Sequence, residues 1–203
     1  QLRGKAALDV ALRRKMAYLT MRASRVIVTP SAAMRDMIRR YHPDLPLNRF
    51  HVLPHGFERE QLSRQPLPEH IAQQLTRSQG RLMILYVSHL EPHKAHDVAI
   101  QAIHELKRQG QPACLYLTMD RHDWPEGYDR LMAHIHDWNL ENDVINLGRV
   151  PEGALGELYR RADVFFFPSL CESFGFPLVE AMGYSLPIVA ADTAINREMC
   201  GEA

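Results

Sequence analysis

Residues 171–182 read Cys-Glu-Ser-Phe-Gly-Phe-Pro-Leu-Val-Glu-Ala-Met and follow the apolar run Val-Phe-Phe-Phe of residues 164–167. The run predicts a buried strand, the glycine a turn, and Pro177 the first turn of a helix. A loop between a strand and a helix N-terminus is where α/β proteins hold phosphorylated ligands, because backbone N–H groups there face the anion. Glu172 lies in this loop and Glu180 about one turn into the helix. The pattern therefore predicts two carboxylates beside a phosphate site.

Outward from this motif, apolar strands alternate with helix-forming segments along most of the chain. We expect strands at 25–30, 50–54, 82–88, 113–118, 143–147, 163–167 and 187–191, and helices at 5–23, 31–41, 69–77, 95–109, 127–138, 152–161, after 176, and at 193–199. Continuous apolar strands separated by helices are typical of a parallel sheet covered on both faces. The expected fold class is a doubly wound, Rossmann-like α/β domain.

The composition is that of an ordinary globular protein, with 46% hydrophobic and 24% charged residues among 203. No apolar run approaches the roughly 20 residues needed to cross a bilayer. The three cysteines, Cys114, Cys171 and Cys200, are too few and too far apart for a disulfide framework. A reducing, cytoplasmic setting fits best.

Basic residues are concentrated near the N-terminus. Residues 1–40 carry ten Lys and Arg against Asp9 and Asp36, although the net charge of the chain is zero. Such a segment suggests peripheral contact with an anionic membrane face. A solvated helix face explains it equally simply, and we favour that reading. Nucleic acid is not expected, because no aromatic residues interleave with the charge.

Several separate segments resemble one family. Residues 24–31 (Ser-Arg-Val-Ile-Val-Thr-Pro-Ser), 52–57 (Val-Leu-Pro-His-Gly-Phe), 86–94 (Tyr-Val-Ser-His-Leu-Glu-Pro-His-Lys) and the Glu-x7-Glu pair of 172–180 are similar to the retaining GT-B glycosyltransferases of family 4, in their donor-binding C-terminal domain. The resemblance runs from residue 25 to the end. It implies a donor-binding domain over 25–203, truncated at both ends, with residues 1–24 belonging to an interdomain helical segment.

The resemblance also implies roles for individual residues. Glu172 would contact hydroxyls of the transferred sugar, Lys94 the diphosphate, and Glu180 the ribose. Backbone groups would contact the sugar and diphosphate at Phe174, Gly175, Phe176 and Leu178, and the base at Arg149 and Val150. No cofactor and no metal is expected. The substrates would be a UDP- or GDP-type sugar and a glycan, lipid-linked or small-molecule acceptor, and the chain alone should bind nucleotide without turnover.

The sequence departs from the family pattern at two places. The family's phosphate loop carries Gly-Arg where this chain has Ser88-His89. Histidine is partly charged near neutral pH and lacks the guanidinium fork. Either His89 gives weaker, pH-dependent stabilisation, or a basic residue elsewhere compensates, or activity is reduced; we favour the first two together. Residues 117–120, Leu-Thr-Met-Asp, replace a glycine-bearing turn, so we expect a differently shaped loop there.

Other interpretations remain open at this point. The histidines at 89, 93 and 96, with Glu91, match no standard zinc spacing, so a metal site is not favoured. Cys171 has no paired base in the sequence and is read as a bystander thiol. The rival functions are a non-catalytic nucleotide- or glycan-binding module and a GT-B relative with epimerase or phosphorylase chemistry.

Overall fold

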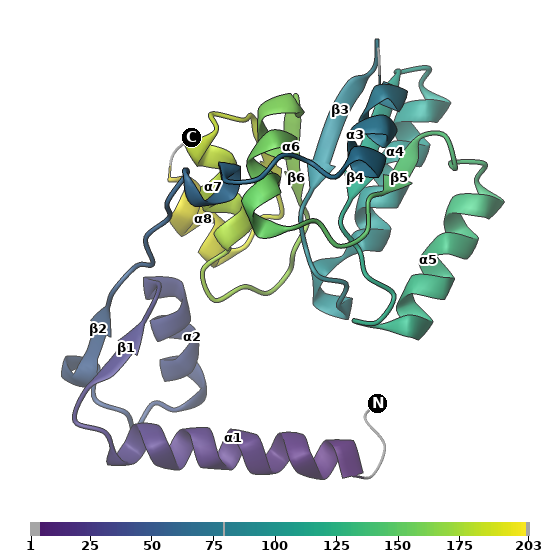
Figure 1. The fold of residues 1–203 in the computed structure, drawn as a ribbon. Helices are drawn as coiled ribbons and strands as arrows, with labels where there is room; N and C mark the ends of the chain where they lie inside the picture. Colours follow the sequence, from purple (N-terminus) through teal and green to yellow (C-terminus); the bar gives the residue numbers. More distant parts are fainter. Residues whose placement is uncertain (1–4, 79, 202–203) are drawn as a thin grey trace. The chain divides into compact units, whose positions relative to one another are not determined.

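The computed structural model describes residues 5–78 and 80–201 (Figure 1). Its contacts divide the chain into two compact units, Gln1–His55 and Gly56–Ala203. The strand after residue 25 pairs with the strand after residue 49. The expected boundary between an interdomain segment and a donor-binding domain at residues 24 and 25 stays a prediction.

The smaller unit holds α1 (Lys5–Ala23), β1 (Ile27–Thr29), α2 (Ala32–Tyr41) and β2 (Phe50–Val52). β1 and β2 are parallel, and α2 packs against both. Ser31 caps α2, because its hydroxyl accepts a hydrogen bond from the Met34 N–H at 3.1 Å. A small core of Ile27, Leu45 and Phe50 holds these elements together.

The helix expected over residues 5–23 is present as α1 with the same bounds. Three of its leucines, Leu8, Leu12 and Leu19, are 72%, 57% and 46% exposed. Basic and apolar side chains therefore both lie open along α1.

The larger unit contains a parallel sheet of the order β5-β4-β3-β6-β7, as far as the described residues show. Its elements run α3 (Glu69–Leu75), β3 (Leu82–Tyr86), α4 (His96–Arg108), β4 (Ala113–Leu117), α5 (Pro125–Asp137), β5 (Val144–Asn146), α6 (Leu155–Arg161), β6 (Val164–Phe167), α7 (Phe176–Gly183), β7 (Ile188–Ala190) and α8 (Ala194–Cys200). Each expected strand and helix of this unit appears with bounds shifted by a few residues. The expected α/β fold with a parallel sheet flanked by helices is confirmed.

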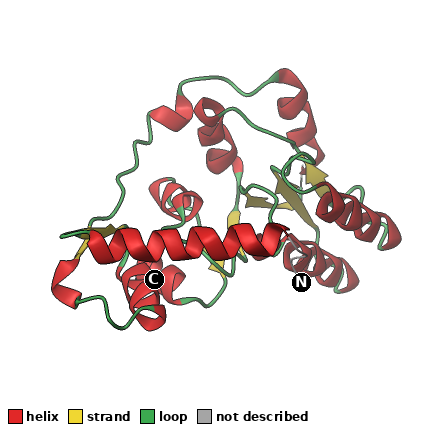
Figure 2. Ribbon diagram, turned by 90° about the horizontal axis from the view of Figure 1, so that it is seen from below, coloured by secondary structure: helices red, strands yellow, loops and turns green. Residues whose placement is uncertain are grey.

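The strands form because their apolar runs are buried on both faces of the sheet. All five residues of β4 are buried, and Phe165 and Phe167 of β6 are fully enclosed. α4 packs on β4, α6 on β3, and α7 on β6 and β7. Figure 2 gives a second view of these strands and of the helices around them.

The order of the strands reverses at β3. From β3 the chain moves outward through β4 to β5, and then crosses back to β6 and on to β7. Right-handed crossovers put the helices of the two halves on opposite faces of the sheet. The loops after β3 and β6 therefore diverge at the carboxyl edge, which is where ligands bind in open α/β sheets.

No helix in the described ranges has both the length and the apolarity that a membrane span requires.

Candidate functional site

The loop after β6 leads into α7 through a left-handed residue. Gly175 has φ 85° and ψ 56°, and α7 begins at the next residue with Pro177 in its first turn. A β-carbon at position 175 would meet its nearest neighbours, Leu178 and Phe167, at 3.7 Å, which is ordinary contact. The positive φ, rather than crowding, is therefore what requires glycine here.

The backbone groups expected to face a ligand are in different situations. Leu178 is fully buried, and its N–H donates to the Gly175 carbonyl at 3.0 Å. Phe174 is buried, whereas Phe176 is 45% exposed. The structure therefore places residues 174–176 at the start of α7. The Leu178 N–H, by contrast, is already hydrogen-bonded within the first turn of that helix.

Lys94 and Glu172 form an ion pair between the two loops that diverge at the carboxyl edge. Lys94 ends the short 3-10 helix Pro92–Lys94 after β3, and its Nζ lies 2.7 Å from Glu172 Oε1. The side chains are 17% and 11% exposed. The backbone reinforces this contact, because the Leu170 N–H donates to the His93 carbonyl at 2.9 Å. The two residues expected to act on the sugar and diphosphate are thus neighbours.

Glu180 is held by a tyrosine from α6. The Tyr159 hydroxyl, on a fully buried side chain, donates to Glu180 Oε2 at 2.6 Å. Burial raises the pKa of Glu180, and the hydrogen bond from Tyr159 counteracts part of that rise. Sequence reasoning missed Tyr159. The available signal was a tyrosine on the buried face of an amphipathic helix, whose hydroxyl needs a partner.

A cavity of about 260 Å³ opens at the carboxyl edge beside Glu180. Its lining comprises Val87, Ser88, His89, Thr118, Asp120, Asp123, Arg149, Val150, Glu152, Leu155, Pro177 and Glu180. The cavity joins His89, Arg149, Val150 and Glu180, four of the predicted site residues. Lys94, Glu172 and the 174–176 segment do not line it. The cavity therefore matches the nucleoside end of the expected site better than its sugar end.

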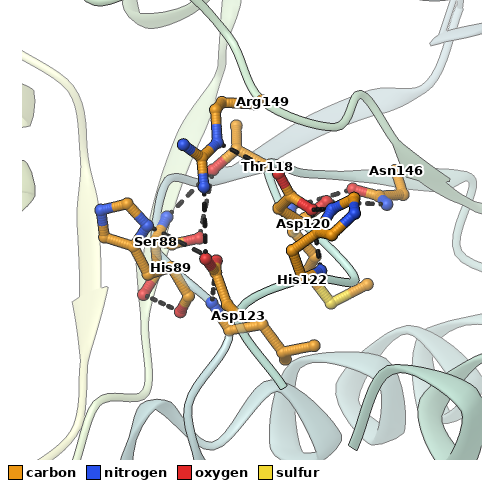
Figure 3. Close-up of polar contacts among 10 residues, drawn as sticks. Ser88, His89, Thr118, Asp120, His122, Asp123, Asn146 and Arg149 are labelled. Carbon is orange, nitrogen blue, oxygen red and sulfur yellow. Dashed lines mark hydrogen bonds and ion pairs between the residues drawn. The ribbon is translucent and has the colours of Figure 1, made fainter. Parts of the chain in front are cut away.

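A polar cluster surrounds one wall of this cavity (Figure 3). Arg149 reaches from the loop after β5 to two carboxylates: its Nε lies 3.1 Å from Asp120 Oδ2, and its Nη2 lies 3.3 Å from Asp123 Oδ1. His89 Nδ1 lies 3.5 Å from the other oxygen of Asp123. Asp123 also accepts a hydrogen bond from the Leu90 N–H at 3.2 Å, which ties it to the loop after β3.

Asp120 belongs to the loop that replaces the family's glycine-bearing turn. Its Oδ1 accepts from the N–H and Nδ1 of His122 at 2.9 and 2.8 Å. The backbone N–H of His122, more than any other partner, lowers the pKa of Asp120. Asn146 of β5 braces the same loop, because its side chain accepts from the Met119 N–H at 3.0 Å and donates to the Met119 carbonyl at 3.1 Å. Side chains from β5 and from within the loop itself therefore hold the loop after β4 in place.

The remaining histidines of the loop after β3 do not form a metal site. In the parts of the chain that the structure describes, no group of three or more His, Cys, Asp or Glu side chains is placed to hold an ion. His93 Nδ1 lies 3.2 Å from Glu91 Oε2, while His96 is buried against the Tyr86 ring at the start of α4.

The sequence and fold of this chain are similar to those of known proteins. Residues 69–203 match the family model described as glycosyl transferases group 1. Over 119 residues the chain is 30% identical to the serotype-specific mannosyltransferase WbdA of Escherichia coli, covering 58% of this chain and 14% of that protein. Over 175 residues it is 28% identical to the D-inositol 3-phosphate glycosyltransferase of Nocardia farcinica, covering 84% and 38%. The chain thus spans well under half of these relatives.

Solved structures share the fold at lower identity. Anabaena HepE, crystallised with UDP and glucose, aligns with a TM-score of 0.73 and 22% identity, covering 91% of this chain and 49% of that one. WaaG, a glycosyltransferase involved in lipopolysaccharide biosynthesis, aligns with a TM-score of 0.65 and 18% identity, covering 85% and 46%.

Proposed function

This chain belongs to the glycosyl transferases group 1 family, and from that premise we propose that it is the donor-binding half of a retaining GT-B glycosyltransferase. The reaction would move a sugar from a nucleoside diphosphate to an acceptor hydroxyl with its anomeric configuration kept. The observation that carries the proposal is the Lys94–Glu172 pair, set between the β3 and β6 loops where the strand order reverses.

The pair suits the sugar and diphosphate end of a donor. Departure of the nucleoside diphosphate puts negative charge on its β-phosphate, and a lysine close to a helix N-terminus stabilises that charge. The Lys94 ammonium has three donors, so it can keep Glu172 and still bind a phosphate oxygen. We assign the sugar hydroxyls to Glu172 and the phosphate contacts to Lys94 and the backbone of residues 174–176. The family mechanism then lets the leaving phosphate assist deprotonation of the acceptor.

The nucleoside would occupy the 260 Å³ cavity. Glu180 lines it and already accepts the Tyr159 hydroxyl through Oε2. Oε1 is the oxygen that we assign to the ribose hydroxyls. Arg149 and Val150 line the same cavity, and we assign their backbone groups to the base. This arrangement asks for no metal and no cofactor.

The identity of donor and acceptor is a proposal at the level of class. HepE was solved with UDP, and WbdA is a mannosyltransferase; a UDP- or GDP-type sugar fits both. The acceptor would be a glycan, a lipid-linked sugar or a small molecule. Because the chain spans less than half of its relatives, we propose that it binds nucleotide by itself but transfers sugar only within a longer protein.

Nucleotide titration tests the proposal. The chain is titrated with UDP, GDP, ADP and TDP while its thermal midpoint is followed, since ligand at 100 times Kd stabilises by about 2.7 kcal/mol. At least one nucleotide should raise the midpoint. Glu180→Gln should weaken that nucleotide about tenfold, because a hydrogen bond to a charged group is lost. Glu105→Gln, on the exposed far end of α4, is the matched control and should change nothing.

Tyr159→Phe sharpens the same experiment. Without the hydroxyl the pKa of Glu180 rises further, because burial is no longer opposed by that hydrogen bond. The acidic limb of the affinity profile should therefore move to higher pH, which a merely structural change would not produce. If no nucleotide shifts the wild-type midpoint, the proposed function is wrong.

A further inference from the structure

The loop after β3 has no arginine, and so it offers no guanidinium that could bind two phosphate oxygens at once. At the position where the resemblance leads us to expect arginine stands His89, whose side chain is 78% exposed and whose Nδ1 lies 3.5 Å from Asp123 Oδ2. An imidazole offers one donor per nitrogen, whereas a guanidinium binds two phosphate oxygens at once. If a diphosphate binds here, the second cation must come from another element.

Arg149 is placed at that position from a different loop. It follows β5, yet its Nη2 contacts Asp123, the same carboxylate that His89 approaches from the other side. Figure 3 shows the guanidinium above this carboxylate, with Ser88 and His89 on one side and Asp120 on the other. The Arg149 head group and the His89 imidazole therefore flank a single side chain at the mouth of the cavity.

The charge around the cavity makes this cation necessary. Of the described residues that line it, Asp120, Asp123, Glu152 and Glu180 are acidic, and Arg149 is the arginine that faces them. A diphosphate entering beside four carboxylates is repelled unless a cation binds it. Lys94, which we also assign to the phosphates, does not line the cavity and shares its charge with Glu172, so it does not offset these carboxylates.

We propose that the Arg149 side chain binds the donor diphosphate and supplies from the β5 loop the guanidinium that the β3 loop lacks. The inference rests on the proposed function and goes beyond it, since that proposal assigns Arg149 a backbone contact with the base. Asp120 and Asp123 hold the side chain over the cavity until the ligand arrives.

The existing partners of Arg149 allow this exchange. Its side chain is 66% exposed, and exposed ion pairs of this kind are weak. Charge-assisted, bidentate bonds to phosphate are stronger. Asp123 does not depend on Arg149 for its own position, because it also accepts from the Leu90 N–H. Arg149 can therefore turn to a phosphate while the wall of the cavity stays in place.

The test separates the diphosphate from the nucleoside. Dissociation constants of UDP, GDP, uridine and guanosine are measured by calorimetry, or by NMR titration where binding is weak, for wild type and Arg149→Gln. We expect Arg149→Gln to weaken the bound diphosphate by about 10- to 100-fold, the loss of a charged hydrogen bond, and to leave the nucleoside unchanged. His89→Arg in the Arg149→Gln background should restore most of the lost affinity for the diphosphate, because residue 89 of the β3 loop then supplies a guanidinium.

Arg121→Gln is the matched control. Arg121 also pairs through Nε and Nη2, in its case with the single carboxylate of Asp129 at 2.8 Å each, and its side chain is 59% exposed, but it does not line the cavity. It should bind every ligand as wild type does. Equal losses for diphosphate and nucleoside in Arg149→Gln would make Arg149 a base contact and overturn the inference, as would no loss at all. Absence of binding to wild type would overturn the proposed function as well.

Discussion

The loops at the carboxyl edge of the sheet fall into two pairs that are held in different ways. The β3 and β6 loops are joined by the Lys94–Glu172 pair, whose side chains are at most 17% exposed, and by a backbone hydrogen bond. Asn146 at the end of β5 also holds the β4 loop through Met119, but the side-chain contact at the cavity is made by Arg149, which is 66% exposed and shares its charge between two aspartates. Buried partners resist separation, whereas exposed ones exchange readily with solvent or ligand. The Lys94–Glu172 contact is therefore suited to fixed geometry and the Arg149 contact to adjustment.

The largest expected effect is on the pH dependence of the free energy of unfolding, and it comes from a buried histidine that follows the β3 loop. His96 is 2% exposed, and burial, followed by the charge of Lys94, lowers its pKa from 6.5 to about 4. The folded state stays neutral where the unfolded chain binds a proton, so stability is complete above pH 6.5 and falls as the pH drops toward 4. At 1.36 kcal/mol per pH unit the loss is about 3 kcal/mol.

Urea denaturation between pH 4 and 8 measures this loss. His96→Leu should reduce the slope in that window, because the proton that His96 binds in the unfolded state but not in the folded state is then removed. The exposed His70 provides a control, and His70→Leu should keep the wild-type slope. A wild-type profile that is already flat would mean that the His96 ring is reached by water.

The next effect concerns the buried pair itself. Lys94→Met leaves the Glu172 carboxylate, 11% exposed, without its cation. We expect a loss of roughly 2 kcal/mol in unfolding free energy, somewhat below the cost of breaking a fully buried pair. Adding Glu172→Gln should recover part of it, since no charge is then left unpaired. Equal stability of the single and double variants would contradict the account of a buried pair.

The smallest effect is expected on the exposed side. Asp120→Asn keeps an oxygen for the His122 N–H but weakens the hold on Arg149. The urea midpoint should not move measurably, in low or high salt, because the contact is open to solvent. A clear, salt-dependent shift would show that the β4 and β5 loops are held as firmly as the β3 and β6 loops.

The helices and strands could be predicted from the sequence, whereas the side-chain contacts between them could not. The apolar runs at 82–88 and 163–167 predicted strands because burial on both faces leaves a continuous pattern. That pattern does not say that β3 lies between β4 and β6, so the contact between Lys94 and Glu172 could not be read from it. The Tyr159–Glu180 bond and the meeting of Arg149 with Asp123 escaped for the same reason, since each joins side chains from separate elements. The roles of all these residues in sugar transfer remain predictions.

The left-handed backbone conformation of Gly175 decides which residues could replace it. The backbone there, φ 85° and ψ 56°, lies in the region that L-residues avoid and their mirror images prefer. Because a β-carbon in the L position would meet only ordinary contacts, the obstacle to an L-residue is the backbone conformation alone. A semisynthetic chain with D-alanine at 175 should keep the turn and stiffen the unfolded chain, whereas L-alanine should distort the entrance to α7. The start of α7 thus depends on the one achiral residue of the motif.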